Sequence, residues 1–97
     1  MTSLTSIKNS IEEIKPYLQS KYDIENLYIF GSYAREEQTE KSDIDILADF
    51  TKTPDLLTFI EIEEYLSSQL QEGVDLVPKR KLKTRLKEKI LREAIEL

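Results

Sequence analysis

The most informative part of this 97-residue chain is Leu27–Phe50, LYIFGSYAREEQTEKSDIDILADF. It begins with Leu27–Phe30, a short apolar and aromatic run that is typical of a buried strand. Gly-Ser follows, then ten residues, then Asp-Ile-Asp at the start of a second apolar run. A glycine lets a ligand approach the backbone without a Cβ in the way. The order therefore predicts an anion-binding turn beside a pair of carboxylates.

Gly31 and Ser32 predict the start of a short helix that faces an anion. Ser32 is a favourable N-cap, and residues 33–37 can continue as a helix. A helix start presents unpaired N–H groups and a partial positive charge, which favours a phosphate. Arg35 lies one turn in and can turn back to the same anion. On Gly-Ser alone, a strand–turn–helix corner without a ligand is the more common interpretation.

Asp43 and Asp45 are predicted to share one face of the second strand. Residues two apart in a strand point the same way, with Cα atoms about 6.6 Å apart. Ile44 and Ile46 then face the core. Two like charges on one face repel each other, and a divalent cation with a preference for oxygen ligands, such as Mg²⁺, removes that repulsion. An isolated Asp-x-Asp is more often a solvated strand face, so this alternative stays open for the pair alone.

Asp75 supplies a third carboxylate from a third short strand, predicted over residues 74–77. Its apolar neighbours point to the opposite face, and Pro78 ends the strand. If this strand lies next to the second one, three acids converge. Two Mg²⁺ ions about 3.5–4 Å apart could then balance the carboxylates and a nucleoside triphosphate, and hold the attacking and leaving oxygens. An exposed strand position is the alternative for Asp75.

The spacing of Gly-Ser, ten residues and Asp-x-Asp resembles the signature of the DNA polymerase β-like nucleotidyltransferase superfamily. The runs GSYAR, SDIDILADF, GVDLV and EAIEL, with the small size, resemble its minimal MNT-type members, which act as antitoxins of HEPN-domain ribonuclease toxins. This resemblance implies metal binding by all three acids, with Asp75 also activating the acceptor hydroxyl. The residues that it implies for the triphosphate are Gly31, Ser32 and Arg35.

The resemblance also implies a reaction and a partner. The reaction is Mg²⁺-dependent transfer of AMP from ATP to a tyrosine of a cognate HEPN toxin. Two alternatives stay open. One is a non-catalytic antitoxin that neutralises its partner by forming a complex. The other is a small-molecule nucleotidyltransferase, although this chain is too short for the acceptor domain of such enzymes. Many members have Gly directly after the arginine, where this chain has Glu36, so we expect the helix to run one turn further.

The amino-acid composition limits which kinds of catalysis and which kinds of partner are possible. With no cysteine and no histidine, disulfides, thiol nucleophiles and Ser-His-Asp catalysis are excluded, and carboxylate and metal chemistry remain. Residues 1–78 hold 6 basic and 16 acidic side chains, net −10, and residues 79–97 hold 8 basic and 3 acidic, net +5. The basic segment Lys79–Arg92 indicates a solvated helix face, or a surface for an acidic partner, a nucleotide or RNA. Overall acidity argues against general nucleic-acid binding.

Length and hydropathy predict one domain over residues 1–97. No signal peptide or apolar stretch of membrane length is present, so a cytoplasmic protein is the default expectation. The fold class is α/β, with the element order αβαβαβα. The resemblance implies a nucleotidyltransferase fold, in which helices flank a small mixed sheet of three strands or slightly more.

Apolar residues at helical spacing predict three longer helices, over residues 3–20, 54–71 and 82–97. Pro16 is expected to kink or restart the first helix. Thr53 is expected to cap the second, with a proline at the first helical position. The apolar arc of the second helix is wider than one core-facing stripe needs, which indicates either a partner surface or a thicker core.

Overall fold

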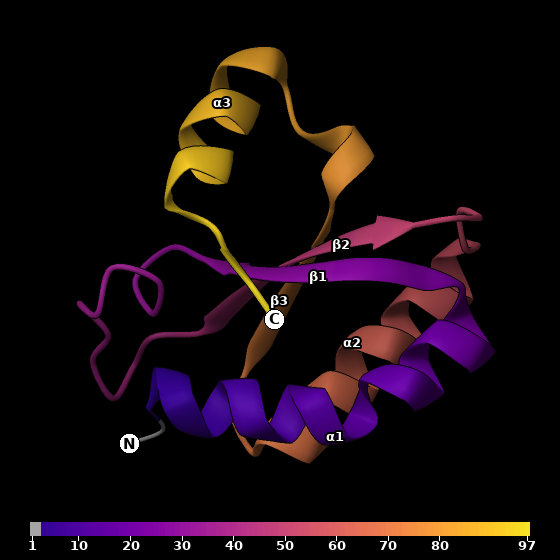
Figure 1. Ribbon diagram of the computed structural model, residues 1–97, viewed down its shortest axis with the longest axis horizontal. Helices are drawn as coiled ribbons and strands as arrows, with labels where there is room; N and C mark the ends of the chain where they lie inside the picture. Colours follow the sequence, from indigo (N-terminus) through magenta and orange to yellow (C-terminus); the bar gives the residue numbers. More distant parts are fainter. Residues whose placement is uncertain (1–2) are drawn as a thin grey trace.

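A computed structural model describes residues 3–97, in which a four-stranded sheet carries two long helices on one face and a short helix on the other (Figure 1). The mixed α/β architecture is confirmed. The elements, in chain order, are α1 Leu4–Tyr22, β1 Ile24–Phe30, β2 Ile44–Phe50, α2 Leu56–Leu70, β3 Val74–Pro78, the 3-10 helix η1 Lys79–Lys81, α3 Thr84–Glu93 and β4 Ile95–Glu96.

The sheet has the strand order β3-β2-β1-β4 and is mixed, as the resemblance implied. β1 pairs antiparallel with both β2 and β4, whereas β2 and β3 run parallel. α2 provides the crossover between the parallel strands, as such a connection requires. It also covers the outer edge of β3, because Glu63 accepts a hydrogen bond from the Leu76 N–H at 2.8 Å. The strands that carry the predicted acids are therefore held from both sides.

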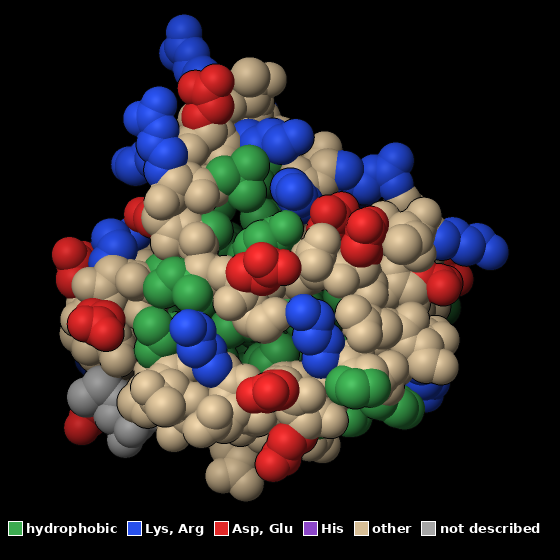
Figure 2. All heavy atoms as spheres, viewed as in Figure 1, with side chains coloured by type: hydrophobic (Ala, Val, Ile, Leu, Met, Phe, Trp, Pro, Cys, Tyr) green, Lys and Arg blue, Asp and Glu red, His purple; other side chains and the backbone are tan. Residues whose placement is uncertain are grey.

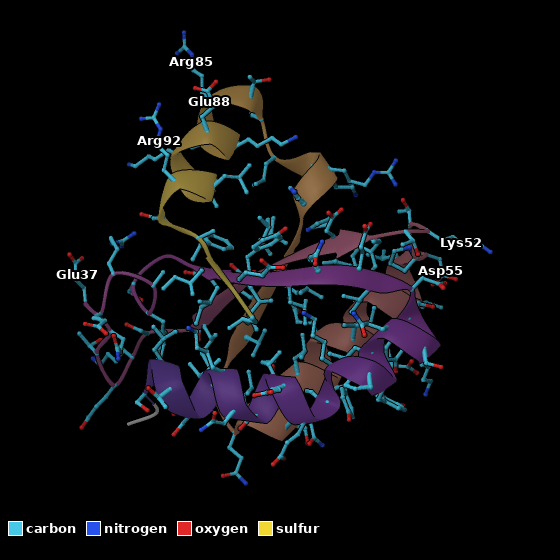
Figure 3. All side chains as sticks on the ribbon, in the orientation of Figure 1. Glu37, Lys52, Asp55, Arg85, Glu88 and Arg92 are labelled. Atoms are coloured by element: carbon cyan, nitrogen blue, oxygen red, sulfur yellow. The ribbon has the colours of Figure 1, made fainter. Side chains whose placement is uncertain are left out.

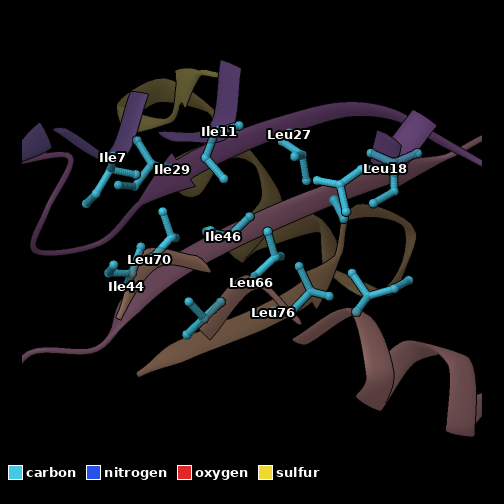
Figure 4. Packing of buried hydrophobic residues seen from close by; sticks show 14 of the residues in the cluster. Ile7, Ile11, Leu18, Leu27, Ile29, Ile44, Ile46, Leu66, Leu70 and Leu76 are labelled. Carbon is cyan, nitrogen blue, oxygen red and sulfur yellow. The ribbon is translucent and has the colours of Figure 1, made fainter. Parts of the chain in front are cut away.

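The core lies between the sheet and the helices α1 and α2 (Figure 4). Ile44 and Ile46 of β2 are fully buried in it, so Asp45 between them must point to the opposite face. Each buried aliphatic side chain contributes about 1.5–3 kcal/mol, which fixes the register of the strand. Other members of this core are Ile7, Ile11, Leu18, Leu27, Ile29, Ile62, Leu66 and Leu76.

The helix α3 covers the opposite face of the sheet and buries none of its own residues. Leu86, in its first turn, is 52% exposed. This face nevertheless contains one fully buried side chain, Leu47 of β2. The C-terminal helix is therefore attached to the sheet far less extensively than α1 or α2.

Two predicted helix boundaries differ from those observed. α1 continues through Pro16, where a kink or a restart of the helix was expected, so the helix does not restart there. Pro16 lies on the exposed side of α1, so water can solvate the carbonyl left without an amide partner. The N-cap of α2 is Asp55 rather than Thr53, and it accepts a hydrogen bond from the Thr58 N–H at 2.7 Å. An aspartate caps at least as well as a threonine.

The prediction of one terminal helix over residues 82–97 was wrong at its end. α3 stops at Glu93, and the chain then extends as β4. The Leu97 N–H donates to the Leu27 carbonyl at 2.8 Å. Pairing with the open edge of β1 satisfies backbone groups that would otherwise lack partners, and this overrides the helical spacing.

Across residues 3–97, none of the helices combines the length and the apolar composition that crossing a membrane requires.

Candidate active site

Asp45 and Asp75 lie side by side on neighbouring parallel strands. In the register of β2 and β3, Asp45 is the direct partner of Asp75, just as Ile46 is the partner of Leu76. Neighbouring strands are about 4.8 Å apart, and both aspartates point away from the core. The expected convergence of these two acids is therefore observed, because the parallel pairing aligns two strands that alternate apolar and acidic residues.

Asp43 lies one residue before β2 rather than within it, since the strand begins at Ile44. Its carboxylate lies against Gly73, where an added Cβ would come within 2.5 Å of Oδ1. Gly73 also accepts the Ile44 N–H at 2.8 Å, which closes the start of the parallel pair. Asp43 therefore reaches the same end of the sheet from the preceding loop. We refer to Asp43, Asp45 and Asp75 as the acid cluster.

Burial and like charge raise the pKa of Asp45. Burial is the larger cause, because it removes water from the carboxylate, and the charges of Asp75 and Asp43 add to it. The Arg35 guanidinium acts in the opposite direction, and Glu93 adds a further increase. The environment of Asp45 therefore favours either a proton or a cation. Such carboxylates are frequent at functional sites.

The predicted helix after Gly31 is not formed, because residues 31–36 make turns instead. Gly31 has φ 73°, a left-handed conformation that suits glycine. The Arg35 N–H donates to the Gly31 carbonyl at 3.2 Å, and the Glu37 N–H donates to the Ser32 carbonyl at 2.8 Å. An added Cβ on Gly31 would overlap the carboxylate of Asp45. The turn thus brings bare backbone against the acid cluster without a helix.

Glu36 ends this turn in a left-handed conformation, with φ 56°. The expectation that the helix runs one turn further was wrong for this reason. Left-handed backbone costs a non-glycine residue about 1 kcal/mol. Glycine would adopt this conformation at position 36 without that cost.

Tyr33 anchors the turn to the core, a role that the sequence did not indicate. Its side chain is 1% exposed and belongs to the hydrophobic cluster between the sheet and the helices. Burial raises the pKa of Tyr33, and the negative charges of Glu72 and Asp43 add to the increase. Because Tyr33 is fixed, the neighbouring Ser32 and Arg35 keep a defined position beside the acid cluster.

Glu93, the last residue of α3, contacts the same turn from the face of the sheet opposite to the core. Its Oε1 accepts hydrogen bonds from the Gly31 N–H at 3.3 Å and from Arg35 Nη1 at 3.1 Å. Arg35 also pairs with Glu37 at 3.2 Å. The position of Glu93 in the sequence could have indicated this contact. The last turn of a helix favours cations, so an acid there needs a partner elsewhere in the fold.

The donor set of the acid cluster suits Mg²⁺ held jointly by protein and nucleotide. Within residues 3–97, no group of three or more His, Cys, Asp or Glu side chains is arranged to hold a metal ion by itself. Mg²⁺ is usually bound through one or two carboxylates together with substrate phosphates, rather than in an all-protein cage. Asp45 offers such a carboxylate directly beside the backbone of Gly31. The residues therefore fit this mode of binding.

Comparison with protein families identifies the class of this chain. Residues 12–97 match the family described as polymerase beta, nucleotidyltransferase. The chain belongs to this family, and it is a nucleotidyltransferase by this membership. The family resemblance read from the Gly-Ser and Asp-x-Asp spacing is thereby confirmed.

Similar proteins define the branch of the family. The protein adenylyltransferase MntA of Thermococcus cleftensis is 42% identical over 95 residues, which cover 98% of this chain and 96% of the relative. The solved structure of a minimal nucleotidyltransferase has a TM-score of 0.84 at 34% identity, and the match covers 99% of this chain and 97% of the other. The chain is therefore similar to minimal nucleotidyltransferases over its whole described length.

Two further structures are of toxin–antitoxin complexes. A chain from a toxin–antitoxin crystal structure with AMP-PNP has a TM-score of 0.77 at 30% identity, covering 92% of this chain and 70% of that one. A chain from the complex of a tri-AMPylated Shewanella oneidensis HEPN toxin with an MNT antitoxin has a TM-score of 0.69 at 26% identity. The match covers 93% of this chain and 70% of that one. An ATP analogue and an AMPylated toxin thus occur in complexes of similar proteins.

Proposed function

We propose that this chain transfers AMP from ATP to a tyrosine of a HEPN-type toxin and thereby acts as its antitoxin. The observation that carries the proposal is the pairing of Asp45 with Asp75 on adjacent parallel strands, directly beside the bare backbone of Gly31. A carboxylate pair next to an anion-binding turn is the arrangement that transfer of a nucleotidyl group needs.

The acid cluster and the Gly31 turn divide the work of binding. We assign Asp43, Asp45 and Asp75 to Mg²⁺, which when bound would neutralise the triphosphate and the departing pyrophosphate. We assign Gly31, Ser32 and Arg35 to the triphosphate. The backbone of Gly31 and the guanidinium of Arg35 are hydrogen-bond donors on one side of the turn, because both donate to the same carboxylate.

In the transfer step, Asp75 takes the proton of the acceptor hydroxyl. The hydroxyl oxygen forms a bond to the α-phosphorus of ATP, and the bond from that phosphorus to the oxygen bridging the β-phosphate breaks. Pyrophosphate leaves, and AMP remains on the acceptor. Asp75 is exposed on β3, one of the two edge strands of the sheet. A phenol from a second protein can approach it there. Positioning and charge stabilisation carry the catalysis.

The first turns of α2 offer a surface for the partner. Leu56, Leu57 and Ile60 are 73%, 81% and 41% exposed, in line with an apolar arc wider than the core requires. Leu56 also lines a mostly apolar cavity of about 210 Å³ whose lining includes Arg80 and Lys81. Lys and Arg side chains also gather over α3 and η1 (Figure 2). This combination suits a partner segment with apolar and acidic side chains.

The experiment is incubation of the chain with ATP labelled at the α-phosphate, Mg²⁺ and a HEPN-type toxin. The proposal expects label on the partner, a mass increase of one or more AMP units on a tyrosine, and loss of both on chelation of Mg²⁺. A partner that is neutralised but unmodified would replace the proposal with a non-catalytic antitoxin. Absence of both complex and modification would contradict the antitoxin role.

The docking surface has a separate test with a matched control. Leu57→Ser removes an 81% exposed side chain and is expected to weaken the complex with the HEPN protein, measured by calorimetry, while leaving thermal stability unchanged. Leu86→Ser changes another exposed leucine, on α3, and is expected to leave the affinity unchanged. An equal loss for both variants would move the interface towards α3.

A further inference from the structure

The carboxylate of Glu93 occupies the anion position that the proposed function assigns to the triphosphate. Glu93 Oε1 accepts from the Gly31 N–H at 3.3 Å and from Arg35 Nη1 at 3.1 Å, and Oε2 lies 3.2 Å from the same nitrogen. The Glu93 side chain is 23% exposed. The protein therefore places its own carboxylate on two of the donors that an incoming phosphate would use.

The two anions cannot use the Gly31 donor together. A backbone amide carries a single hydrogen, and in this structure it points to Glu93. A triphosphate carries a charge of about −4 and would lie next to the Glu93 charge in a site already crowded by the acid cluster. Binding of phosphate at Gly31 therefore requires Glu93 to withdraw.

Withdrawal of Glu93 costs little free energy because α3 is weakly attached to the sheet. α3 buries none of its own residues, and segments with few buried contacts open at low free-energy cost. Figure 3 shows Arg85, Glu88 and Arg92 projecting from α3 away from the sheet. The end of α3 that contacts the Gly31 turn is its last turn, which contains Glu93. The Ala94 N–H closes this last turn by donating to the Ile90 carbonyl at 2.8 Å.

We propose that Glu93 is an internal competitor of the triphosphate: it sets the nucleotide affinity of the site, and nucleotide binding releases the end of α3 from the Gly31 turn. This inference rests on the proposed nucleotide site. It links occupancy of the site to the freedom of the basic segment Lys79–Arg92, because Glu93 is the side chain of α3 that pairs with both Gly31 and Arg35.

Calorimetric titration with Mg²⁺ and AMP-PNP tests the affinity. Glu93→Gln removes the charge and weakens both hydrogen bonds, so it is expected to tighten binding about three- to tenfold. Glu88→Gln makes the same chemical change at an exposed position of the same helix and is expected to bind like the wild type. Unchanged or weaker binding by Glu93→Gln would overturn the inference, and weaker binding would make Glu93 a support of the cradle instead.

Hydrogen exchange on the unmutated chain gives a second test. Saturation with Mg²⁺ and AMP-PNP is expected to speed amide exchange in residues 90–94, since Glu93 no longer holds this turn to Gly31. Slower or unchanged exchange there would overturn the inference. Absence of AMP-PNP binding in all three proteins would contradict the proposed function as well, whereas wild-type binding without a gain in Glu93→Gln contradicts only the competitor role.

Discussion

The acid cluster and the helix α3 lie on the same face of the sheet, but different interactions hold them in place. Asp45 and Asp75 are positioned by the core, because the side chains beside them in sequence are packed between the sheet and the helices α1 and α2. Glu93 is held by its hydrogen bonds to Gly31 and Arg35, and no residue of its helix is fully buried. The fixed region provides the acid cluster, and the weakly held region provides the carboxylate that we propose competes with the triphosphate for the donors of Gly31 and Arg35. Rigidity and ease of release are thus assigned to separate segments.

The largest expected effect is on the fixed region. Tyr33 is 1% exposed and joins the Gly31 turn to the core. Tyr33→Ala is expected to lower the free energy of unfolding by about 3–5 kcal/mol, because it leaves a large cavity. Denaturant titration measures the loss. Tyr33→Phe, which keeps the ring, is the control and should lose much less. A small loss for Tyr33→Ala would show that the turn is not anchored by the core.

Asp45→Asn is expected to raise the free energy of unfolding by about 0.5–2 kcal/mol at pH 7. The pKa of Asp45 is raised by burial, by Asp75 and by Asp43, so the folded state binds its proton more tightly than the unfolded state. Wild-type stability then increases as pH falls through the raised pKa. The advantage of the variant should therefore shrink as pH falls through the raised pKa and vanish below the ordinary pKa of an aspartate. An advantage independent of pH would contradict this electrostatic account.

Glu36→Gly tests the backbone of the turn itself. Glycine accepts φ 56° without the cost that a side chain brings, although it also loses more freedom on folding. The two terms leave an expected gain of about 0.5 kcal/mol in the free energy of unfolding. Thermal denaturation measures it against Glu37→Gly, a neighbour outside the left-handed region, which should destabilise. Destabilisation by Glu36→Gly would argue against the left-handed conformation.

The smallest expected effect belongs to the weakly held region. Leu86 is 52% exposed on α3, so Leu86→Ala is expected to change the free energy of unfolding by less than about 0.5 kcal/mol. Leu47 is fully buried on the face that α3 covers, and Leu47→Ala should cost about 2–5 kcal/mol. Urea titration of the two variants gives the ratio. Comparable losses would mean that α3 packs on the sheet as firmly as the core does.

The sequence predicted those elements whose residues follow a local pattern, such as alternation along a strand. Alternation of apolar and acidic residues placed Asp45 and Asp75 on the face opposite the core, and the resemblance implied the mixed sheet in which β2 and β3 pair. The rest depends on contacts between distant segments. The edge of β1 draws residues 95–96 into a strand, and the left-handed Glu36 replaces a helix by a turn. Neither leaves a periodic pattern.

The candidate site was found in part for the same reason. Gly31, Ser32, Arg35 and the acid cluster follow from short spacings within one stretch and one further strand. Glu93 lies 58 residues beyond Arg35 in sequence and meets it through the fold. Its position in the last turn of a basic helix was the available signal, because an acid is unfavourable there without a partner.

Two aspartates of β2 test whether the acid cluster performs nucleotidyl transfer. Asp45 belongs to the cluster, whereas Asp49 lies on the same face of the strand and pairs with Lys79 at 3.7 Å. Transfer of α-labelled AMP to the HEPN protein is measured for Asp45→Asn and Asp49→Asn. We expect a loss of about 100-fold or more for Asp45→Asn and a change within about threefold for Asp49→Asn. Full activity in Asp45→Asn, or an equal loss in both, would contradict this role of the acid cluster.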